Sequence, residues 1–289
     1  MNQGWTVHKF GGASLAGPWE FCRVAEILAE NKAARQAVVV SASYGVTDRL
    51  LHLLELAVES SSSVEDQLES LRSHHETLAA GILSEEGARL YDEKLAADIT
   101  TVASILEAIR LLRSASAEAA SLVSGYGEVW SARLLAALLA ERGLPARWMH
   151  AGEVLTIEPA ELGPVVDWDT SSRRLSEQLS DEDELLVITG YVARTSGGVP
   201  ATLGRNGSDF SASIFAGLLE AEAVSIWTDV DGVMSGDPRI VREAAVIPEL
   251  SYNEAMELAY FGAKVIHPGT MAPLVERGIP LFIRNSFQP

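Results

Sequence analysis

Short hydrophobic runs rich in β-branched residues alternate with helical patterns at the start of the chain. Thr6-Val-His-Lys-Phe is typical of a strand that leads into Gly11-Gly12, and a helix is predicted from about Pro18 to Asn31. The run from Ala37 to Ser41 is bounded by polar residues, which is the pattern of a strand buried on both faces. A strand, a helix and a second strand at this spacing predict a right-handed βαβ unit in a parallel sheet.

The middle of the chain, from Val46 to about Arg142, has an almost entirely helical pattern, with a predicted polar loop at Ser60 to Ser63. Beyond it the pattern alternates again between strands and helices. We predict strands and then helices at the following ranges: Ala146–Met149, Glu184–Thr189, Ala223–Thr228 and Pro280–Arg284 for strands, and Ser208–Leu219, Asn253–Phe261 and Pro268–Arg277 for helices.

These patterns predict one continuous α/β domain made of two lobes. The N-terminal lobe is predicted to cover residues 1–197, with the helical segment of about 46–142 inserted in it. The C-terminal lobe is predicted to cover residues 198–289. The boundary is placed at Gly197-Gly198 because this dipeptide separates two α/β patterns.

The composition limits the classes of protein to which the chain can belong. With 289 residues, 47% of them hydrophobic, the chain can bury a large core, and its net charge of −18 argues against nucleic acid as the main partner. Cys22 is the only cysteine, so no intrachain disulfide can form. The N-terminus lacks a signal-peptide pattern and no apolar run approaches the roughly 20 residues that span a bilayer, so we predict a soluble cytoplasmic protein without membrane contact. His74 and His75 are helix neighbours that face different directions, and no metal site is predicted.

Two glycines follow the first predicted strand, in Lys9-Phe10-Gly11-Gly12. Backbone N–H groups at such a turn can approach a phosphate because no Cβ is in the way. Lys9 lies just before the turn and can place a positive charge on a phosphoryl group. The same residues are also compatible with an ordinary tight turn beside a surface lysine, and this segment alone does not decide between the two interpretations.

A second glycine-rich segment, Thr202-Leu-Gly-Arg-Asn-Gly-Ser-Asp-Phe-Ser, leads into a predicted helix. Free amides at a helix N-terminus favour an anion, and Arg205 can hold a carboxylate through two parallel hydrogen bonds. A capped helix with a solvated arginine would explain Ser208 or Asp209. It would leave the clustered glycines and Thr202 without an explanation.

Polar residues also end a predicted strand, in Trp227-Thr228-Asp229-Val230-Asp231-Gly232. Ligands of parallel sheets bind beyond the carboxyl ends of strands, so these side chains are candidates to line a site, although Asp231-Gly232 is equally typical of an Asx turn. Three further segments carry a charge: Asp237-Pro238-Arg239, Gly262-Ala263-Lys264-Val265, and Gly127-Glu128, whose carboxylate can hold a substrate ammonium group. Each of these charges is also compatible with a solvated surface position.

These segments, in this order, resemble the aspartokinases of the amino-acid-kinase family. Lys9-Phe10-Gly11-Gly12-Ala13-Ser14 is similar to the opening Lys-Phe-Gly-Gly-Thr-Ser of that family, and Val40-Ser41-Ala42 with Thr47-Asp48 is similar to its second strand and turn. The remaining signatures are similar to Gly127-Glu128, Thr202 to Asp209, Trp227 to Val230 and Gly262 to Val265. The resemblance covers essentially the whole chain. It implies a three-layer αβα sandwich with a mainly parallel central sheet, as in carbamate-kinase-like folds.

The resemblance implies a role for each matching residue. Lys9, Asp209 and Lys264 would be the catalytic residues, and both lysines would contact the ATP phosphates together with the amides of Gly11 and Gly12. The nucleotide would further contact Thr228, Asp229, Met234 and Arg239. The substrate aspartate would have Glu128 on its ammonium group and Arg205 on its α-carboxylate. Its pocket would be completed by Ser41, Thr47, Tyr191, Thr202, Ser208 and Asp209.

The reaction that the resemblance implies is ATP-dependent phosphorylation of the L-aspartate side chain, the first step towards lysine, threonine and methionine. The β-carboxylate is already an anionic nucleophile at neutral pH, so no strong general base is needed. Its approach to a polyanionic phosphate is the main barrier, which lysines and Mg²⁺ lower. Asp209 and Asp229 are therefore interpreted as groups that organise the lysines, the metal or water. The acyl phosphate product hydrolyses readily, which predicts closure of the site against water.

Several positions depart from the family pattern. Ala13 stands where a threonine is usual, Tyr126 replaces a histidine, Asn206 replaces a glycine or acidic residue, and Met234 stands where relatives have a tyrosine beside the adenine. We expect altered nucleotide affinity rather than inactivity. Typical aspartokinases continue into regulatory domains, whereas this chain stops at Pro289, either as part of a larger bifunctional enzyme or as a kinase without that sensor. On either interpretation, lysine and threonine should not inhibit this polypeptide through such domains.

Two other interpretations remain open. One is a kinase of the same fold that acts on another amino-acid carboxylate or on a carbamate. The other is a catalytically silent binding subunit, against which the retained Lys9, Arg205, Asp209, Asp229 and Lys264 argue. Besides L-aspartate as a small-molecule partner, a homo-oligomer or a fusion to a further enzyme domain remains open.

Overall fold

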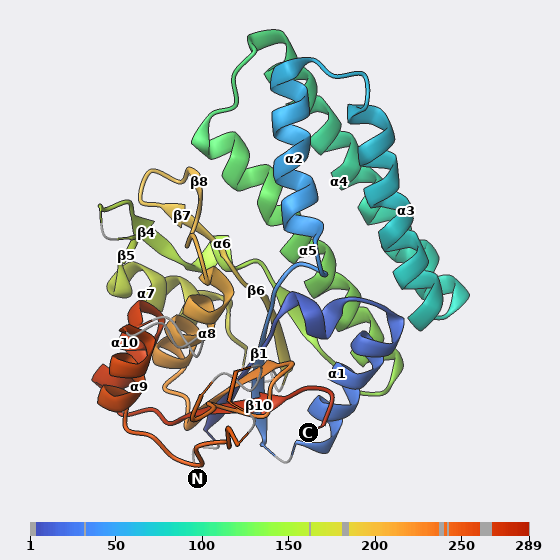
Figure 1. Cartoon of the computed structure of the whole chain (residues 1–289). Coiled ribbons are helices and arrows are strands. Elements are labelled where there is room, and N and C mark those ends of the chain that lie inside the picture. The colour runs from blue at the N-terminus through green and yellow to red at the C-terminus, as the bar shows by residue number, and fades with distance from the viewer. Residues whose placement is uncertain are drawn as a thin grey trace.

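The centre of the protein is a parallel sheet. The computed structural model describes residues 4–31, 33–161, 163–180, 185–236, 240–241, 243–260 and 268–288. In these residues six strands pair in the order β10-β9-β1-β2-β6-β3, and every pairing is parallel (Figure 1). Their bounds are Trp5–Phe10 (β1), Arg35–Val40 (β2), Arg147–Met149 (β3), Leu185–Thr189 (β6), Ala223–Thr228 (β9) and Leu281–Asn285 (β10).

Side chains of the sheet enter two separate hydrophobic clusters, one on each face. In β2, Val38 and Val40 belong to one cluster and Ala37 and Val39 to the other, because successive side chains of a strand point to opposite faces. The first cluster is covered by α1 (Pro18–Glu30) and α5 (Ala117–Glu141). The second is covered by α8 (Gly207–Leu218) and α10 (Pro268–Arg277), with α9 (Tyr252–Tyr260) beside α10. The predicted αβα sandwich with a mainly parallel central sheet is confirmed.

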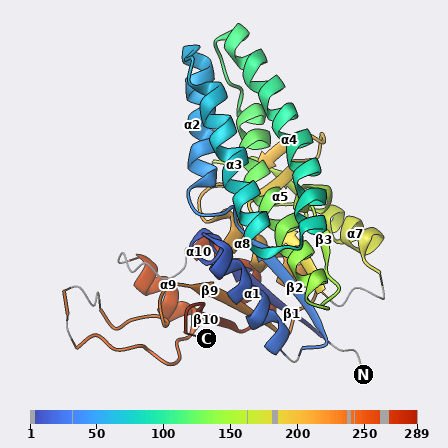
Figure 2. The same ribbon diagram turned by 90° about the vertical axis from the view of Figure 1, so that its right-hand side faces the viewer.

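Four helices fill the segment that the sequence predicted to be helical. They are α2 (Val46–Glu59), α3 (Val64–Ile82), α4 (Glu85–Leu112) and α5, and they rise together from one end of the sheet (Figures 1 and 2). Leu53, Leu71 and Leu106 are buried between them, in the same cluster as the α1 face of the sheet. The helices α2, α3 and α4 and the face of the sheet covered by α1 and α5 therefore share one hydrophobic core.

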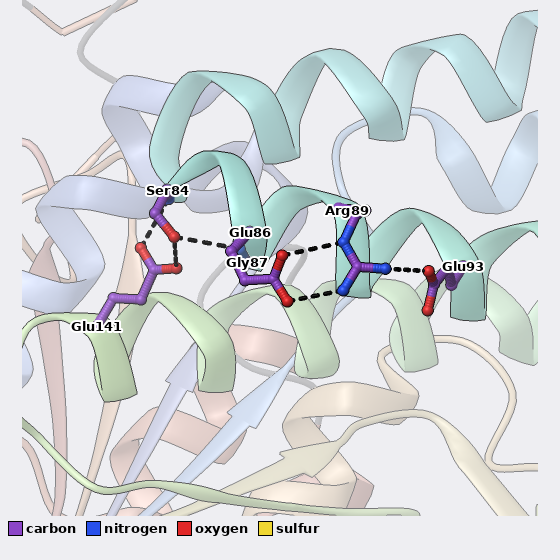
Figure 3. Close-up of polar contacts among 6 residues, drawn as sticks. All are labelled: Ser84, Glu86, Gly87, Arg89, Glu93 and Glu141. Atoms are coloured by element: carbon purple, nitrogen blue, oxygen red, sulfur yellow. Dashed lines mark hydrogen bonds and ion pairs between the residues drawn. The ribbon is translucent and has the colours of Figure 1, made fainter.

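Figure 3 shows how the beginning of α4 is tied to the end of α5. Ser84 caps α4: its Oγ accepts a hydrogen bond from Gly87 N at 3.1 Å and donates to Glu141 Oε1 at 2.7 Å. The backbone N of Ser84 donates to Glu141 Oε2 at 2.8 Å. The ion pairs of Arg89 with Glu86 and Glu93 lie on the exposed side of α4 and contribute little to stability. These hydrogen bonds join the start of α4 to the end of α5, the helix that carries Glu128.

A second sheet was not predicted from the sequence. Its strands pair in the order β5-β4-β7-β8, with α6 before β4 and α7 after β5 in the chain. The bounds are Thr156–Glu158 (β4), Val165–Val166 (β5), Val192–Thr195 (β7) and Pro200–Thr202 (β8), with α6 at Ala151–Val154 and α7 at Trp168–Gln178. β7 and β8 form an antiparallel hairpin, and the predicted lobe boundary Gly197-Gly198 falls in its turn. The division into two lobes stays a prediction.

The helices in the described part of the chain include none that is long and apolar enough to cross a membrane.

Candidate active site

An ion pair lies at the carboxyl end of the central strand. Lys9, the next-to-last residue of β1, has its Nζ 2.7 Å from Oδ1 of Asp209, in the first turn of α8. The side chains are only 13% and 22% exposed. The interpretation of Lys9 as a solvated surface lysine is therefore wrong. Asp209 holds the ammonium group in one position, at a point where β1 and α8 meet.

Two glycines leave the backbone bare beside this lysine. Gly11 is the N-cap of a short 3₁₀ helix, Gly12–Leu15 (η1), and a Cβ added to Gly11 would lie 3.3 Å from Lys9 Nζ. A Cβ added to Gly12 would lie 3.0 Å from the carbonyl oxygen of Ala42, in the loop after β2. Glycine at 11 therefore leaves space beside the lysine, and glycine at 12 avoids a tight contact with the backbone of the neighbouring loop.

The Lys9 ammonium group faces a cavity of about 220 Å³, which we call the central cavity. Of the predicted residues, Lys9, Gly11, Gly12, Asp209 and Thr228 line it. Trp227, Val230 and Gly232, from the segment predicted to line a site, also form its wall, together with Ala13. Three further residues of the wall had no predicted role: Ser14, Ile226 and Ile283. These come from the ends of β1, β9 and β10 and from the following loops, the edge where parallel sheets bind ligands.

A serine pair that was not predicted lies beside the central cavity, whose wall includes Ser14. The Oγ atoms of Ser14 and Ser286 lie 2.9 Å apart and are buried. The backbone N of Ser286 donates to the carbonyl of Thr228 at 2.8 Å. The segment after β10 is thereby tied to the ends of β1 and β9. The Lys-Phe-Gly-Gly-Ala-Ser run offers Ser14 as a signal, whereas nothing near Ser286 indicates its partner 272 positions away.

Glu128 lies in the middle of α5 and is only 3% exposed, so the interpretation as a solvated surface carboxylate is wrong. Its Oε1 accepts a hydrogen bond from the backbone N of Ala42 at 3.2 Å, whereas Oε2 is buried without a partner among the described residues. Burial raises the pKa of the carboxyl to about 8, although the hydrogen bond from Ala42 opposes this shift. A positive group next to Oε2 would stabilise the ionised form.

Ala42 connects Glu128 with the glycine turn. Its N–H binds Glu128 and its carbonyl packs on Gly12, so the loop after β2 joins the two parts of the site. A Cβ added to Gly127 would lie 2.7 Å from the Cβ of Ala42, which shows how closely α5 approaches this loop. Glycine at 127 allows the buried carboxylate to reach the edge of the sheet.

Tyr191 and Ser208 are brought together at the end of β6. A Cβ added to Gly190 would lie 2.7 Å from Ser208 Oγ and 2.9 Å from the carbonyl of Val40, so α8, β6 and β2 converge there. Tyr191 has a positive φ of 67°, and its backbone N donates to Ser211 Oγ at 2.9 Å. Its carbonyl accepts from Leu203 N at 2.8 Å. The loop that carries Arg205 is thus fixed at its start.

The remaining predicted residues are less closely joined to this group. Ser41, Thr47 and Thr202 are half-buried on the loop after β2, the first turn of α2 and the end of β8. Arg205 and Asp229 are exposed, and Asp229 Oδ1 accepts a hydrogen bond from Thr228 Oγ1 at 3.1 Å. The roles assigned to these side chains stay predictions.

Of three further predicted nucleotide contacts, the structure describes one, Met234. Met234 pairs with Val246 in an isolated antiparallel bridge and is not among the described residues that line the central cavity. Arg239 and Lys264 lie outside the described residues. Asn206, the departure that replaces a glycine or acidic residue, has a φ of 56°, a left-handed conformation that asparagine tolerates well.

In the part of the chain that the structure describes, no group of three or more His, Cys, Asp or Glu side chains could hold a metal ion. Asp209, the acidic side chain on the cavity wall, is already paired with Lys9.

The sheet order, the lysine held at the end of its central strand and the glycine turn define an α/β fold with a candidate anion site at the edge of its parallel sheet. The model of the amino acid kinase family matches residues 4–285, and the chain belongs to this family.

Curated relatives and solved structures point to one branch of the family. The chain is 39% identical to the bifunctional aspartokinase/homoserine dehydrogenase 2, chloroplastic, of Arabidopsis thaliana over 98% of its own length and 31% of that protein. It is 38% identical to bifunctional aspartokinase/homoserine dehydrogenase 2 of Escherichia coli strain K12, over 99% of its own length and 35% of the relative. The chain thus spans about a third of these relatives.

A crystal structure of E. coli aspartokinase III in complex with aspartate and ADP, in its R-state, is similar in fold. The TM-score is 0.88 at 31% identity, and the match covers 98% of this chain and 62% of that one.

Proposed function

We propose that this chain is a kinase domain that transfers the γ-phosphoryl group of MgATP to the side-chain carboxylate of L-aspartate. The observation that carries the proposal is the pairing of two features at one edge of the sheet. Lys9 beside the bare Gly11 offers a positive, open position for a phosphoryl group. Glu128 Oε2 offers a buried, unpartnered acceptor for an ammonium group. Ala42 contacts both parts.

The proposed chemistry is a direct displacement. One oxygen of the aspartate β-carboxylate forms a bond to the γ-phosphorus while the bond from that phosphorus to the β–γ bridging oxygen breaks, and ADP leaves with the electron pair. No proton is transferred, because the carboxylate is already ionised at neutral pH. The products are 4-phospho-L-aspartate and ADP.

In this proposal the chain positions two anions and reduces their repulsion. Lys9, oriented by Asp209, stabilises charge on the phosphoryl oxygens, with the amides of Gly11 and Gly12 as further donors. Mg²⁺ would arrive on the nucleotide phosphates and neutralise part of their charge. Lys264, Arg239 and Asp229 keep their predicted roles at the nucleotide.

The substrate assignment rests on Glu128. A buried carboxylate without a partner is costly, and a substrate ammonium group would remove that cost on binding. Arg205 is proposed to bind the α-carboxylate, with Ser41, Thr47, Tyr191, Thr202 and Ser208 around it. The names of the relatives, and the aspartate and ADP bound to aspartokinase III, support this choice.

We further propose that the reaction begins the synthesis of lysine, threonine and methionine from aspartate. The bifunctional relatives, which join an aspartokinase to a homoserine dehydrogenase, support this placement and the fusion to a further enzyme domain. The cytoplasmic location and the homo-oligomer stay predictions.

A hydroxylamine trap tests the proposal. The protein is incubated with MgATP and L-aspartate, and the acyl phosphate is captured as its hydroxamate while ADP is measured separately. We expect both signals to depend on aspartate and to fall at least 100-fold in Lys9→Ala, with Lys94→Ala, an exposed lysine on α4, as the matched control.

Other outcomes decide between the alternatives. Hydroxamate from glutamate or another carboxylate, but not from aspartate, would identify a kinase of different specificity. Carbamate-dependent ADP release would do the same. Absence of phosphoryl transfer to any acceptor, with nucleotide binding intact, would identify a silent binding subunit.

A further inference from the structure

A second cavity, of about 210 Å³, lies on the opposite side of α5 from the loop after β2. We call it the rear cavity. Its walls are α5, the β7–β8 hairpin, Asp98 of α4 and His150 after β3. Leu122 and Val129 of α5 and Val192 and Pro200 of the hairpin make one side apolar. It shares no lining residue with the central cavity.

The charged side of the rear cavity carries more positive than negative charge. Arg133 and Arg194 line it, against Asp98 as the carboxylate. Asp98 is already used: its Oδ2 accepts from Arg133 Nη1 at 2.6 Å and from Trp130 Nε1 at 3.1 Å. Arg194 has no ion pair with any described residue. One guanidinium group is therefore left without a counter-charge in a protein of net charge −18.

The Arg133 part of the cationic side is held in place before any ligand binds. The Arg133 guanidinium lies over the Trp148 ring, 4.8 Å from its centroid, and the Nε of Arg133 is buried without a partner among the described residues. His150 Nδ1 is also buried and unpartnered there. Burial lowers the pKa of His150; the charge of Glu153 opposes this shift, and Arg194 and Arg133 add to it. The net effect is a lowered pKa, so this imidazole is neutral at pH 7 and remains a hydrogen-bonding group. Preformed donors of this kind bind an anion at little cost in ordering.

We propose that the rear cavity is a binding site for a small monocarboxylate with a branched apolar body. The carboxylate would bind Arg194, with Arg133 Nε as a second donor, and the apolar body would pack on Leu122, Val129 and Val192. A volume of about 210 Å³ fits such a molecule. The proposal does not depend on the identity of the reaction.

The rear cavity is joined to the candidate active site by the elements that form its walls. Glu128 lies on α5 between Gly125 and Val129. Tyr191 immediately precedes β7 and Thr202 is the last residue of β8, so both lie at the open end of the hairpin. A Cβ added to Gly125 would lie 2.6 Å from Val192, so helix and hairpin are in tight contact beside the cavity. A ligand bound in the rear cavity would therefore contact both α5 and the hairpin, the two elements that carry these candidate active-site residues.

Isothermal titration with 3-methylbutanoate, in the presence of saturating ADP and aspartate, tests the proposal. We expect saturable binding at one site per chain, at least tenfold weaker in Arg194→Ala, and no binding of the uncharged 3-methylbutanamide. Arg173→Ala removes an exposed arginine on α7 and should bind the probe like the parent chain.

A second variant, in which a larger side chain fills the rear cavity, tests the site without changing a charge. Leu122 is 40% exposed, so Leu122→Trp should fold, as checked by circular dichroism, and block the cavity. Equal binding by Arg194→Ala or Leu122→Trp, or equal binding of the amide, would overturn the proposal. So would the lack of saturable binding up to about 10 mM probe.

Discussion

Replacement of Glu128 by glutamine tests two effects of its charge: the loss of stability caused by a buried carboxylate, and the binding of the substrate ammonium group. The carboxyl is buried with one hydrogen bond, from Ala42, and its pKa is raised to about 8 from an ordinary 4.5. Glutamine keeps a carbonyl oxygen that can accept the same hydrogen bond, but it never ionises. Glu128→Gln therefore removes the charge and nearly nothing else.

The stability of the parent chain should depend on pH through this group. Because the pKa of the folded state is raised, the stabilisation by the protonated carboxyl is present in full below pH 4.5 and is lost as the pH rises towards 8. The difference in pKa corresponds to a free energy of unfolding on the order of 5 kcal/mol. The variant should thus gain stability relative to the parent between pH 5 and pH 8.5, by up to about that amount.

Aspartate binding should become stronger as the pH rises, whereas the stability of the parent chain falls. An ammonium group prefers the ionised carboxylate, so the KM of the parent chain for aspartate should fall by roughly 25-fold between pH 6.5 and 8.5 as Glu128 ionises. Glu128→Gln should show a higher KM without this slope. The assays are urea unfolding and hydroxamate kinetics at several pH values, with Glu118→Gln, an exposed carboxylate on the same helix, as the control. An equal pH slope of stability and of KM in Glu128→Gln would refute the reasoning.

Three further substitutions test other parts of the structure. Arg205→Ala should raise the KM for aspartate at least tenfold and leave that for ATP unchanged, and an equal rise in both would speak against its assigned role. Gly12→Ala places a Cβ 3.0 Å from the Ala42 carbonyl and should lower stability by about 1 to 3 kcal/mol and raise the KM for ATP, which unfolding and kinetics would measure. Ser84→Ala removes the cap of α4 and should cost about 1 kcal/mol in urea unfolding with kcat unchanged; an unchanged stability would contradict the cap assignment.

Much of the fold follows from the chain's local patterns. The strand Ala223–Thr228 and the helix Pro268–Arg277 were predicted with the observed bounds, because each combines a regular pattern with clear end signals. The sheet of β4, β5, β7 and β8 was missed because its strands have two to four residues, too short for alternation to show. Helix α7 was missed because its sequence is mostly polar and buries only Ser171 and Leu175.

The candidate site shows a similar limit. The glycine turn and the α8 loop could be identified from local sequence, since each contains the residues that an anion site needs. Nothing local indicates that Lys9 and Asp209 form an ion pair, because that contact depends on the order of the strands. Burial of Glu128 has one signal: α5 is apolar on nearly all sides around it, which is typical of a buried helix.

A crystal structure of the protein with ADP and L-aspartate tests the central claim most directly. The account predicts the substrate ammonium nitrogen within about 3 Å of Glu128 Oε2 and the side-chain carboxylate turned towards Lys9. An aspartate bound with its ammonium group away from Glu128, or a nucleotide whose phosphates lie away from Lys9 and Gly11, would contradict it.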